Sequence, residues 1–131
     1  MITEDMLPAM QGVVPSTLVT SSKDGVPNSA IISQAYYVSD DRIALSFQFF
    51  NKTIKNIREN AQASLQILHP ATMEMWDMEI EFDHSETEGP LFDQMDMQLE
   101  AIASMSGLTG VFQLKAADIY KVKSVTKVKP D

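Results

Sequence analysis

The residues best suited to chemistry stand in the stretch FQFFNKTIKNIR, residues 47–58. Asn51, Lys52 and Thr53 follow an aromatic, strand-like run, and the apolar spacing behind them predicts a helix with Asn51 as its N-cap. The N-terminus of a helix has unpaired backbone N–H groups and a partial positive charge. With the Lys52 ammonium and the side-chain donors of Asn51 and Thr53 added, the pattern predicts a binding site for a phosphate group.

A plainer interpretation of this stretch stays open. Lys52, Lys55 and Arg58 would then form one charged face of a surface helix, and Asn51 would only cap it. The helix dipole favours acids in a first turn, so Lys52 is slightly unfavourable there unless an anion binds. The chain has no Walker-type glycine loop and no GxGxxG motif, so neither a nucleoside triphosphate nor a Rossmann-bound dinucleotide is indicated.

Composition limits the class of protein. The 131 residues predict one domain, 1–131, with 44% apolar and 21% charged residues, as is ordinary for a globular protein. The absence of cysteine excludes disulfides and thiolate metal sites. The net charge is −8, with no Lys or Arg between Glu59 and Leu114, which argues against nucleic acid and anionic membranes. Without a membrane-length apolar run or a signal-like N-terminus, we expect a cytoplasmic protein.

Hydrophobic patterning predicts a mainly β domain. The Asp-Gly turn in KDGVPN separates two strand-like runs, residues 16–22 and 29–38, and residues 42–50 form a third, so that the three make a meander. A helix is expected from Pro90 to a C-terminal cap at Gly107. The remaining expected elements are a short helix at 3–10 capped by Thr3, strands at 63–68 and 73–82, and one or two strands within 110–128. Mostly antiparallel strands with two helices between them favour a small barrel or curled sheet.

The order of these elements resembles a known family. A DGxPN turn, a strand, an acidic turn, a strand ending in FFNKT, and a helix with NIRENAQAS resemble the pyridoxamine 5′-phosphate oxidase-like FMN-binding split-barrel family. The similarity is best from Thr17 to Leu68 and weaker in SETEGPLFDQM and GVFQLKAADIYKV. It implies a Greek-key split β-barrel with two or three short helices. It also implies a homodimer that holds flavin mononucleotide (FMN) at its interface.

The resemblance also implies which residues bind the cofactor. The strand residues Ser46, Phe47 and Gln48 would lie beside the flavin ring and ribityl chain. The turn after that strand would hold the 5′-phosphate, and an earlier strand would contact the polar edge of the ring. The residues of these two groups are Asn51, Lys52 and Thr53 for the phosphate, and Ile32 and Ser33 for the ring edge.

The chain also departs from the namesake oxidase. That enzyme is longer and holds its substrate's phosphate with a C-terminal basic segment, for which no Arg pair is found here. Many relatives have Arg in the phosphate turn, whereas Lys52 offers a point charge rather than a bidentate clamp.

The expected function is therefore that of an FMN-dependent oxidoreductase with a small-molecule substrate. The cofactor would perform the redox step, and no general acid or base is indicated. Three alternatives stay open: a flavin-storing or sensing module without turnover, the same barrel with heme or a deazaflavin, and a barrel that binds proteins only.

Other residues carry weaker signals. His84 stands near Asp83, Glu86 and Glu88, a group that could suggest a metal site, but its irregular spacing favours a solvated turn and no metal is expected. Trp76 could pack in the core or cover the flavin from the partner subunit. The C-terminal lysines are most simply a charged edge strand, and the methionines core residues.

Overall fold

A computed structural model of the chain describes residues 1–10, 15–32, 35–47, 51–105 and 114–129. For five residues within these ranges it gives the backbone alone: Phe47, Asn51, Lys52, Ile102 and Met105. The helices are the 3-10 helix η1 (Glu4–Ala9), α1 (Asn51–Glu59) and α2 (Pro90–Met105). The strands are β1 (Ser16–Ser21), β2 (Pro27–Ile32), β3 (Ala35–Ser39), β4 (Arg42–Phe47), β5 (Gln62–Leu68), β6 (Met75–Glu86) and β7 (Ala116–Val128).

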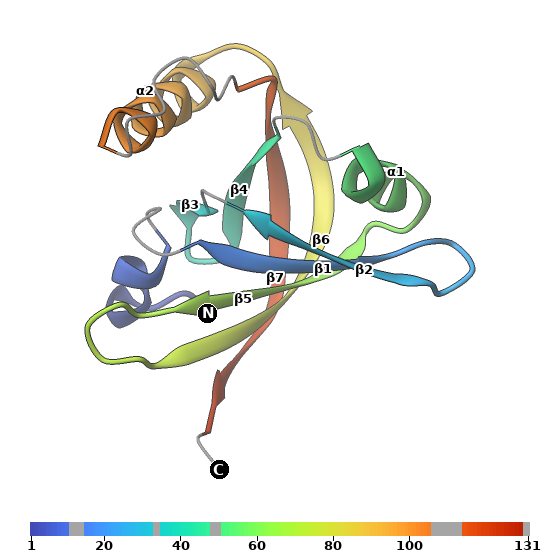
Figure 1. Ribbon diagram of the computed structural model, residues 1–131, viewed down its shortest axis with the longest axis horizontal. Helices are drawn as coiled ribbons and strands as arrows, with labels where there is room; N and C mark the ends of the chain where they lie inside the picture. Colours follow the sequence, from blue (N-terminus) through green and yellow to red (C-terminus); the bar gives the residue numbers. More distant parts are fainter. Residues whose placement is uncertain (11–14, 33–34, 48–50, 106–113, 130–131) are drawn as a thin grey trace.

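All seven strands belong to one antiparallel sheet in the order β2-β1-β5-β6-β7-β4-β3. The two ends of this order, β2 and β3, follow each other in the chain with only residues 33–34 between them. Three residue steps separate Ile32 from Ala35, and a chain spans at most about 11 Å over that length. The two ends of the sheet therefore lie close together, and the sheet has to curl, as Figure 1 shows.

The predicted meander has the correct pairing of neighbouring strands, but its middle strand is divided into two. Residues 29–38 were expected as one strand, whereas the structure has two, β2 and β3. The first pairs with β1, so that Ser16 opposes Ile32, and the second pairs with β4, so that Ala35 opposes Leu45. The change of partner explains the division, because a strand that serves both ends of a curled sheet has to bend between them.

The curled sheet has two apolar cores, one on each face. The larger core lies inside the curl and contains residues that alternate along the strands, among them Ile43 and Leu45 of β4 and Met78 and Ile80 of β6. The smaller core lies between the outer face and α2, where Met95 and Leu99 pack near Ala44, Ala117 and Ile119. Because both faces of this part of the sheet are covered, Ala116 to Tyr120 are all buried.

Several predicted helix features are confirmed and two need correction. Pro90 is the first residue of α2, and Met95 and Leu99 are buried as expected, whereas the cap predicted at Gly107 lies outside the described residues. The N-terminal helix is a 3-10 helix, and Thr3 makes no cap hydrogen bond because its hydroxyl bonds to the Asp5 carboxylate instead. The last strand is single and runs from Ala116 to Val128.

The two helices after β4 and β6 lie on different parts of the sheet. Figure 1 shows α1 next to β1 and β2, and α2 at the end of the sheet where β7 begins. In the described parts of the chain, no helix has the length and apolar character needed to cross a membrane.

Candidate functional site

The predicted phosphate-binding turn is the first turn of α1. Asn51, Lys52 and Thr53 are its first three residues, so Asn51 begins the helix in the structure instead of preceding it as a cap. Such boundaries differ by one or two residues between assignments. The turn carries no acidic residue, so its unpaired backbone N–H groups face no competing carboxylate of their own turn. The N-terminal end of α1 can therefore accept an anion.

Thr53 is fixed to the sheet by a hydrogen bond. Its side chain is only 4% exposed, and the Asn28 amide of β2 donates to its hydroxyl oxygen, Nδ2 to Oγ1, over 3.2 Å. A buried hydroxyl without a partner would cost free energy, so this bond holds the first turn of α1 at β2. Asn28 was not predicted as part of the site.

Two more amide–hydroxyl bonds hold the rest of the helix. The Asn56 amide donates to Thr20 Oγ1 over 3.2 Å, and the Asn60 amide donates to Ser21 Oγ over 3.0 Å. Asn56 and Asn60 are four residues apart, so they lie on one helix face, and that spacing was a signal the sequence offered. Ile57 adds an apolar contact, because it is buried in the larger core. We call these bonds, with the one between Asn28 and Thr53, the three amide–hydroxyl pairs.

The other predicted cofactor residues divide into three cases. Ser46 is buried in β4 opposite Ala117, and Phe47 is the last residue of that strand. Ile32 is buried in the larger core, so its side chain packs against protein and only its backbone could contact a ligand. Ser33 and Gln48 lie outside the described residues.

The fold brings the described members of this set near one another. Asn28 joins β2 to α1, and Ile32 ends β2 three residues before Ala35, which opposes Leu45 of β4. The end of β2 thus lies beside β4 where the sheet curls back on itself, and the start of α1 is held to the beginning of β2, four residues before Ile32 (Figure 1).

A second polar cluster lies inside the curl and was missed by sequence reasoning. Asp118 is 2% exposed and accepts a 2.6 Å hydrogen bond from the Ser85 hydroxyl. Burial raises the pKa of the Asp118 carboxyl, although the Ser85 hydrogen bond and the Arg58 charge act in the opposite direction. Burial also raises the pKa of Tyr120, and its neighbour Asp118 adds to that effect.

Aromatic contacts connect this cluster to α1. The Phe82 and Tyr120 rings meet edge to face, with centroids 5.5 Å apart. The Arg58 guanidinium, in the last turn of α1, lies 5.1 Å from the centroid of the Phe82 ring. Arg58 therefore makes a cation–π contact, and it does not belong to the phosphate turn.

The two histidines are engaged elsewhere. The His84 ring bonds to the Glu86 and Asp83 carboxylates, and these hydrogen bonds raise its pKa. Among the described residues no group of three His, Asp or Glu side chains could hold a metal ion. The His69 ring nitrogen accepts the backbone N–H groups of Ala71 and Thr72. Trp76 is buried in the larger core, in agreement with the packing interpretation.

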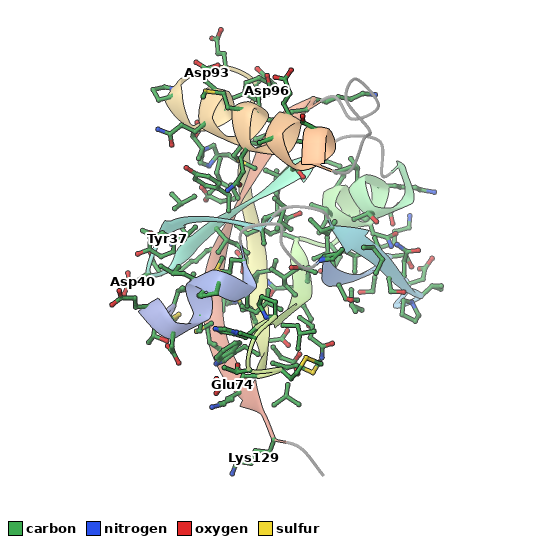
Figure 2. The ribbon with its side chains drawn as sticks, turned by 60° about the vertical axis from the view of Figure 1, so that its left-hand side comes forward. Tyr37, Asp40, Glu74, Asp93, Asp96 and Lys129 are labelled. Atoms are coloured by element: carbon green, nitrogen blue, oxygen red, sulfur yellow. The ribbon has the colours of Figure 1, made fainter. Side chains whose placement is uncertain are left out.

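The acidic stretch is spread over the molecule. Asp93 and Asp96 point away from the sheet on the outer side of α2, whereas Glu74 lies at the opposite end, close to the end of β7 (Figure 2). On β6 three further carboxylates accept hydrogen bonds from neutral partners on β5, in the pairs Gln62–Glu81, Ser64–Glu79 and Gln66–Asp77. These acids do not form one surface around the start of α1.

A hollow of about 360 Å³ lies at the end of β6 where Glu74 stands. Its walls are mostly apolar and come from the β5–β6 turn and the end of β7, with the residues Thr72, Met73, Glu74, Met75, Lys127 and Val128. Its charged groups, Glu74 and Lys127, pair with each other. The start of α1 has the better chemistry for a ligand, because its donors have no such partner within their own turn.

Comparison with solved structures identifies the class of fold. An FMN-binding protein from Syntrophomonas wolfei is similar at a TM-score of 0.78 and 21% identity, covering 97% of this chain and 88% of that one. A proposed pyridoxamine 5′-phosphate oxidase from Lactobacillus delbrueckii is similar at 0.68 and 10%, covering 95% and 93%. The chain has the split-barrel fold of the pyridoxamine 5′-phosphate oxidase-like FMN-binding proteins, which confirms the predicted fold.

Two further structures show that proteins of this fold differ in ligand. An F420 reductase is similar at a TM-score of 0.68 and 9% identity, covering 95% of this chain and 98% of that one. HutZ, a heme storage protein from Vibrio cholerae, is similar at 0.56 and 15%, covering 96% and 94%.

In sequence, uncharacterized protein MJ0282 of Methanocaldococcus jannaschii is 33% identical over 66 residues. That match covers 49% of this chain, and the chain spans 44% of that relative. No family model matches the chain.

Proposed function

We propose that this chain is an FMN-binding oxidoreductase that holds the 5′-phosphate at the first turn of α1. The observation that carries the proposal is that turn itself: it has no acid, Lys52 stands in it, and Asn28 fixes it to β2. A phosphate dianion fits this donor set, which combines backbone N–H groups, an ammonium and two polar side chains. Similarity in fold to an FMN-binding protein supports the choice of cofactor.

The remaining roles follow from the resemblance and from burial. Ser46, Phe47 and Gln48 would lie along the ring and ribityl chain, and Ser33 with the backbone of Ile32 would contact the polar edge of the ring. The side chain of Ile32 has no part in binding, because the core buries it. When bound, FMN supplies the electron or hydride transfer, and the protein's residues bind, orient and shield it.

The proposal includes a homodimer with the cofactor at its interface. The contacts proposed for this chain come only from β2, β4 and the start of α1, whereas small-molecule sites usually bury most of their ligand. A second subunit would supply the missing cover.

The first test is a visible absorption spectrum after the purified protein is soaked in FMN and desalted. We expect flavin bands at about one FMN per chain for the wild type. Lys52→Ala should bind FMN at least about tenfold more weakly, since a hydrogen bond or ion pair to a charged group is worth about 1.5–3 kcal/mol. Lys55→Ala is the matched control, because Lys55 is exposed on the same helix outside the first turn, and it should bind like the wild type.

Two results would contradict the proposal. A wild-type protein that leaves the desalting column colourless would exclude a flavin protein of useful affinity. Equal FMN occupancy in Lys52→Ala and the wild type would show that the phosphate does not bind at the first turn of α1.

A second candidate is the same barrel with another ligand, as storage protein or enzyme. This candidate is supported by the similar folds of an F420 reductase and a heme storage protein. Both histidine rings, however, already bond to neighbours within the chain, so neither is set out as a heme ligand. The spectrum of the soaked protein distinguishes heme, deazaflavin and flavin. Reduction of the bound flavin by a nicotinamide donor, directly or through a reductase, would separate an enzyme from a storage or sensing module.

A further inference from the structure

The three amide–hydroxyl pairs that hold α1 are not alike. In two of them the helix side supplies the amide, Asn56 or Asn60, and β1 supplies the hydroxyl. In the pair at the first turn the roles are exchanged: β2 supplies the Asn28 amide and the helix supplies the Thr53 hydroxyl. The exchange places a hydroxyl group at the N-terminal end of α1, where the backbone N–H groups are unpaired.

The hydrogen of that hydroxyl group has no acceptor in the described structure. A hydroxyl has one hydrogen to donate and two lone pairs to accept with. Thr53 Oγ1 accepts a hydrogen bond from Asn28 Nδ2 and makes no other hydrogen bond within the described residues, although Thr53 is only 4% exposed. A buried donor without an acceptor is costly, and an acceptor supplied by a ligand would relieve that cost.

We propose that Asn28 is a positioning residue of the phosphate site. By donating to Thr53 Oγ1, the Asn28 amide occupies the oxygen's accepting side and turns the hydroxyl hydrogen towards the position where a phosphate oxygen binds. Thr53 then donates to the phosphate together with the backbone N–H groups of the first turn. This inference rests on the proposed function, since it concerns the same phosphate.

The test compares FMN with riboflavin, which has the same ring and ribityl chain but no phosphate. The dissociation constants of both ligands are measured by titration of flavin fluorescence for the wild type, Asn28→Ala, Thr53→Val, Thr53→Ser and the double variant Asn28→Ala/Thr53→Val. We expect Asn28→Ala to weaken FMN binding about threefold to tenfold, the usual size of one neutral hydrogen bond, and to leave riboflavin binding unchanged. Thr53→Ser keeps the hydroxyl and should bind FMN like the wild type.

The double variant tests whether Asn28 acts through Thr53. Once the hydroxyl is removed in Thr53→Val, loss of the Asn28 amide should weaken FMN binding no further, so the double variant should match Thr53→Val. Asn60→Ala is the matched control. It removes an amide–hydroxyl pair of the same chemistry at the other end of α1 and should keep the wild-type ratio of FMN to riboflavin affinity.

The outcomes separate this inference from the proposed function. If Asn28→Ala lowers FMN and riboflavin affinity equally, or if its effect adds in full to that of Thr53→Val, Asn28 only stabilises the helix and the inference is overturned. If the wild type binds FMN no better than riboflavin, the phosphate site itself is absent and the proposed function fails before Asn28 is in question.

Discussion

Asp118 is a carboxyl group placed where a charge is poorly solvated. It is buried in β7 between Leu45 of β4 and Ser85 of β6. Ser85 donates one hydrogen bond to it, and among the described residues no cation comes within ion-pair distance, because Arg58 lies over the Phe82 ring. Burial raises the pKa of this carboxyl above the value it has in the unfolded chain.

The sign of the resulting pH dependence follows from linkage. The folded protein holds the Asp118 proton to a higher pH than the unfolded chain does, so Asp118 lowers the free energy of unfolding progressively as the pH rises through that interval. Asp118→Asn, which keeps the acceptor for Ser85 and removes the charge, should therefore raise the free energy of unfolding at pH 7.5. We expect a gain of the order of 1 kcal/mol in urea denaturation.

The gain should shrink as the pH falls towards about 4, the ordinary pKa of an unfolded Asp, and should vanish below that pH, where the carboxyl is neutral in both states. Asp96→Asn on the outer side of α2 is the exposed control and should change stability by less than about 0.5 kcal/mol at either pH. A destabilised Asp118→Asn at pH 7.5 would show that Arg58 and Ser85 outweigh the cost of burial.

At the level of single residues, the sequence predicts local chemistry better than long-range contacts. Lys52 and Thr53 could be assigned to a helix N-terminus because neighbouring residues define that helix. Asn28 and Asp118 could not be found in the same way, since Thr53 is 25 residues from Asn28 and Ser85 is 33 residues from Asp118. Such pairs depend on the strand order, which the hydrophobic pattern does not contain.

Among the elements, two hairpin turns place residues in the left-handed backbone region. Gly25, in the β1–β2 turn, has φ +83°, and a Cβ built there would meet no atom within 4 Å. Met73, in the β5–β6 turn, has φ +64° although it carries a side chain, and that side chain is 67% exposed. The same backbone strain is therefore avoided in one hairpin and present in the other.

Substitutions at these two positions should change the free energy of unfolding in opposite directions. Met73→Gly should raise the free energy of unfolding by up to about 1 kcal/mol, because glycine adopts this conformation without a Cβ clash and an exposed side chain contributes little packing. Gly25→Ala should lower it by about 1 kcal/mol through backbone strain alone. Thermal and urea unfolding of both variants would measure this. If both variants moved in the same direction, backbone strain would not control these turns.

The elements also show where patterning succeeds. In β6, the buried residues Trp76, Met78 and Ile80 alternate with more exposed residues, so the burial of this strand follows the predicted alternation. Residues 29–38 were expected as one strand, yet β2 and β3 within that range have different partners. Local sequence carries the period of a strand, whereas the place where a strand leaves one neighbour for another is decided by closure of the whole sheet.

For the molecule as a whole, the outer face of the β1–β2 hairpin is the surface relevant to the proposed homodimer. Val19 and Ile31 stand diagonally across these strands on the same face, 41% and 64% exposed. Their neighbours across the sheet, Ser64 and Gln66, are polar and bond to acids of β6. An exposed apolar pair within a polar sheet is the kind of feature that a second subunit would cover.

Sedimentation velocity at several concentrations tests the dimer and this face together. We expect the FMN-loaded wild type to sediment at the mass of two chains. Ile31→Lys should weaken association by at least about tenfold, because each pair of subunits would have to bury two added charges. The stability of the single chain should change by less than about 0.5 kcal/mol, because Ile31 is exposed.

Val26→Lys is the matched control on the same hairpin, since Val26 is also exposed but lies in the turn, away from the face of Val19 and Ile31. It should leave the dimer intact. A wild type that stays monomeric with FMN bound would show that one chain alone covers the cofactor. A dimer that resists Ile31→Lys would move the interface to another surface of the barrel, and FMN occupancy measured in the same samples would show whether binding and association depend on each other.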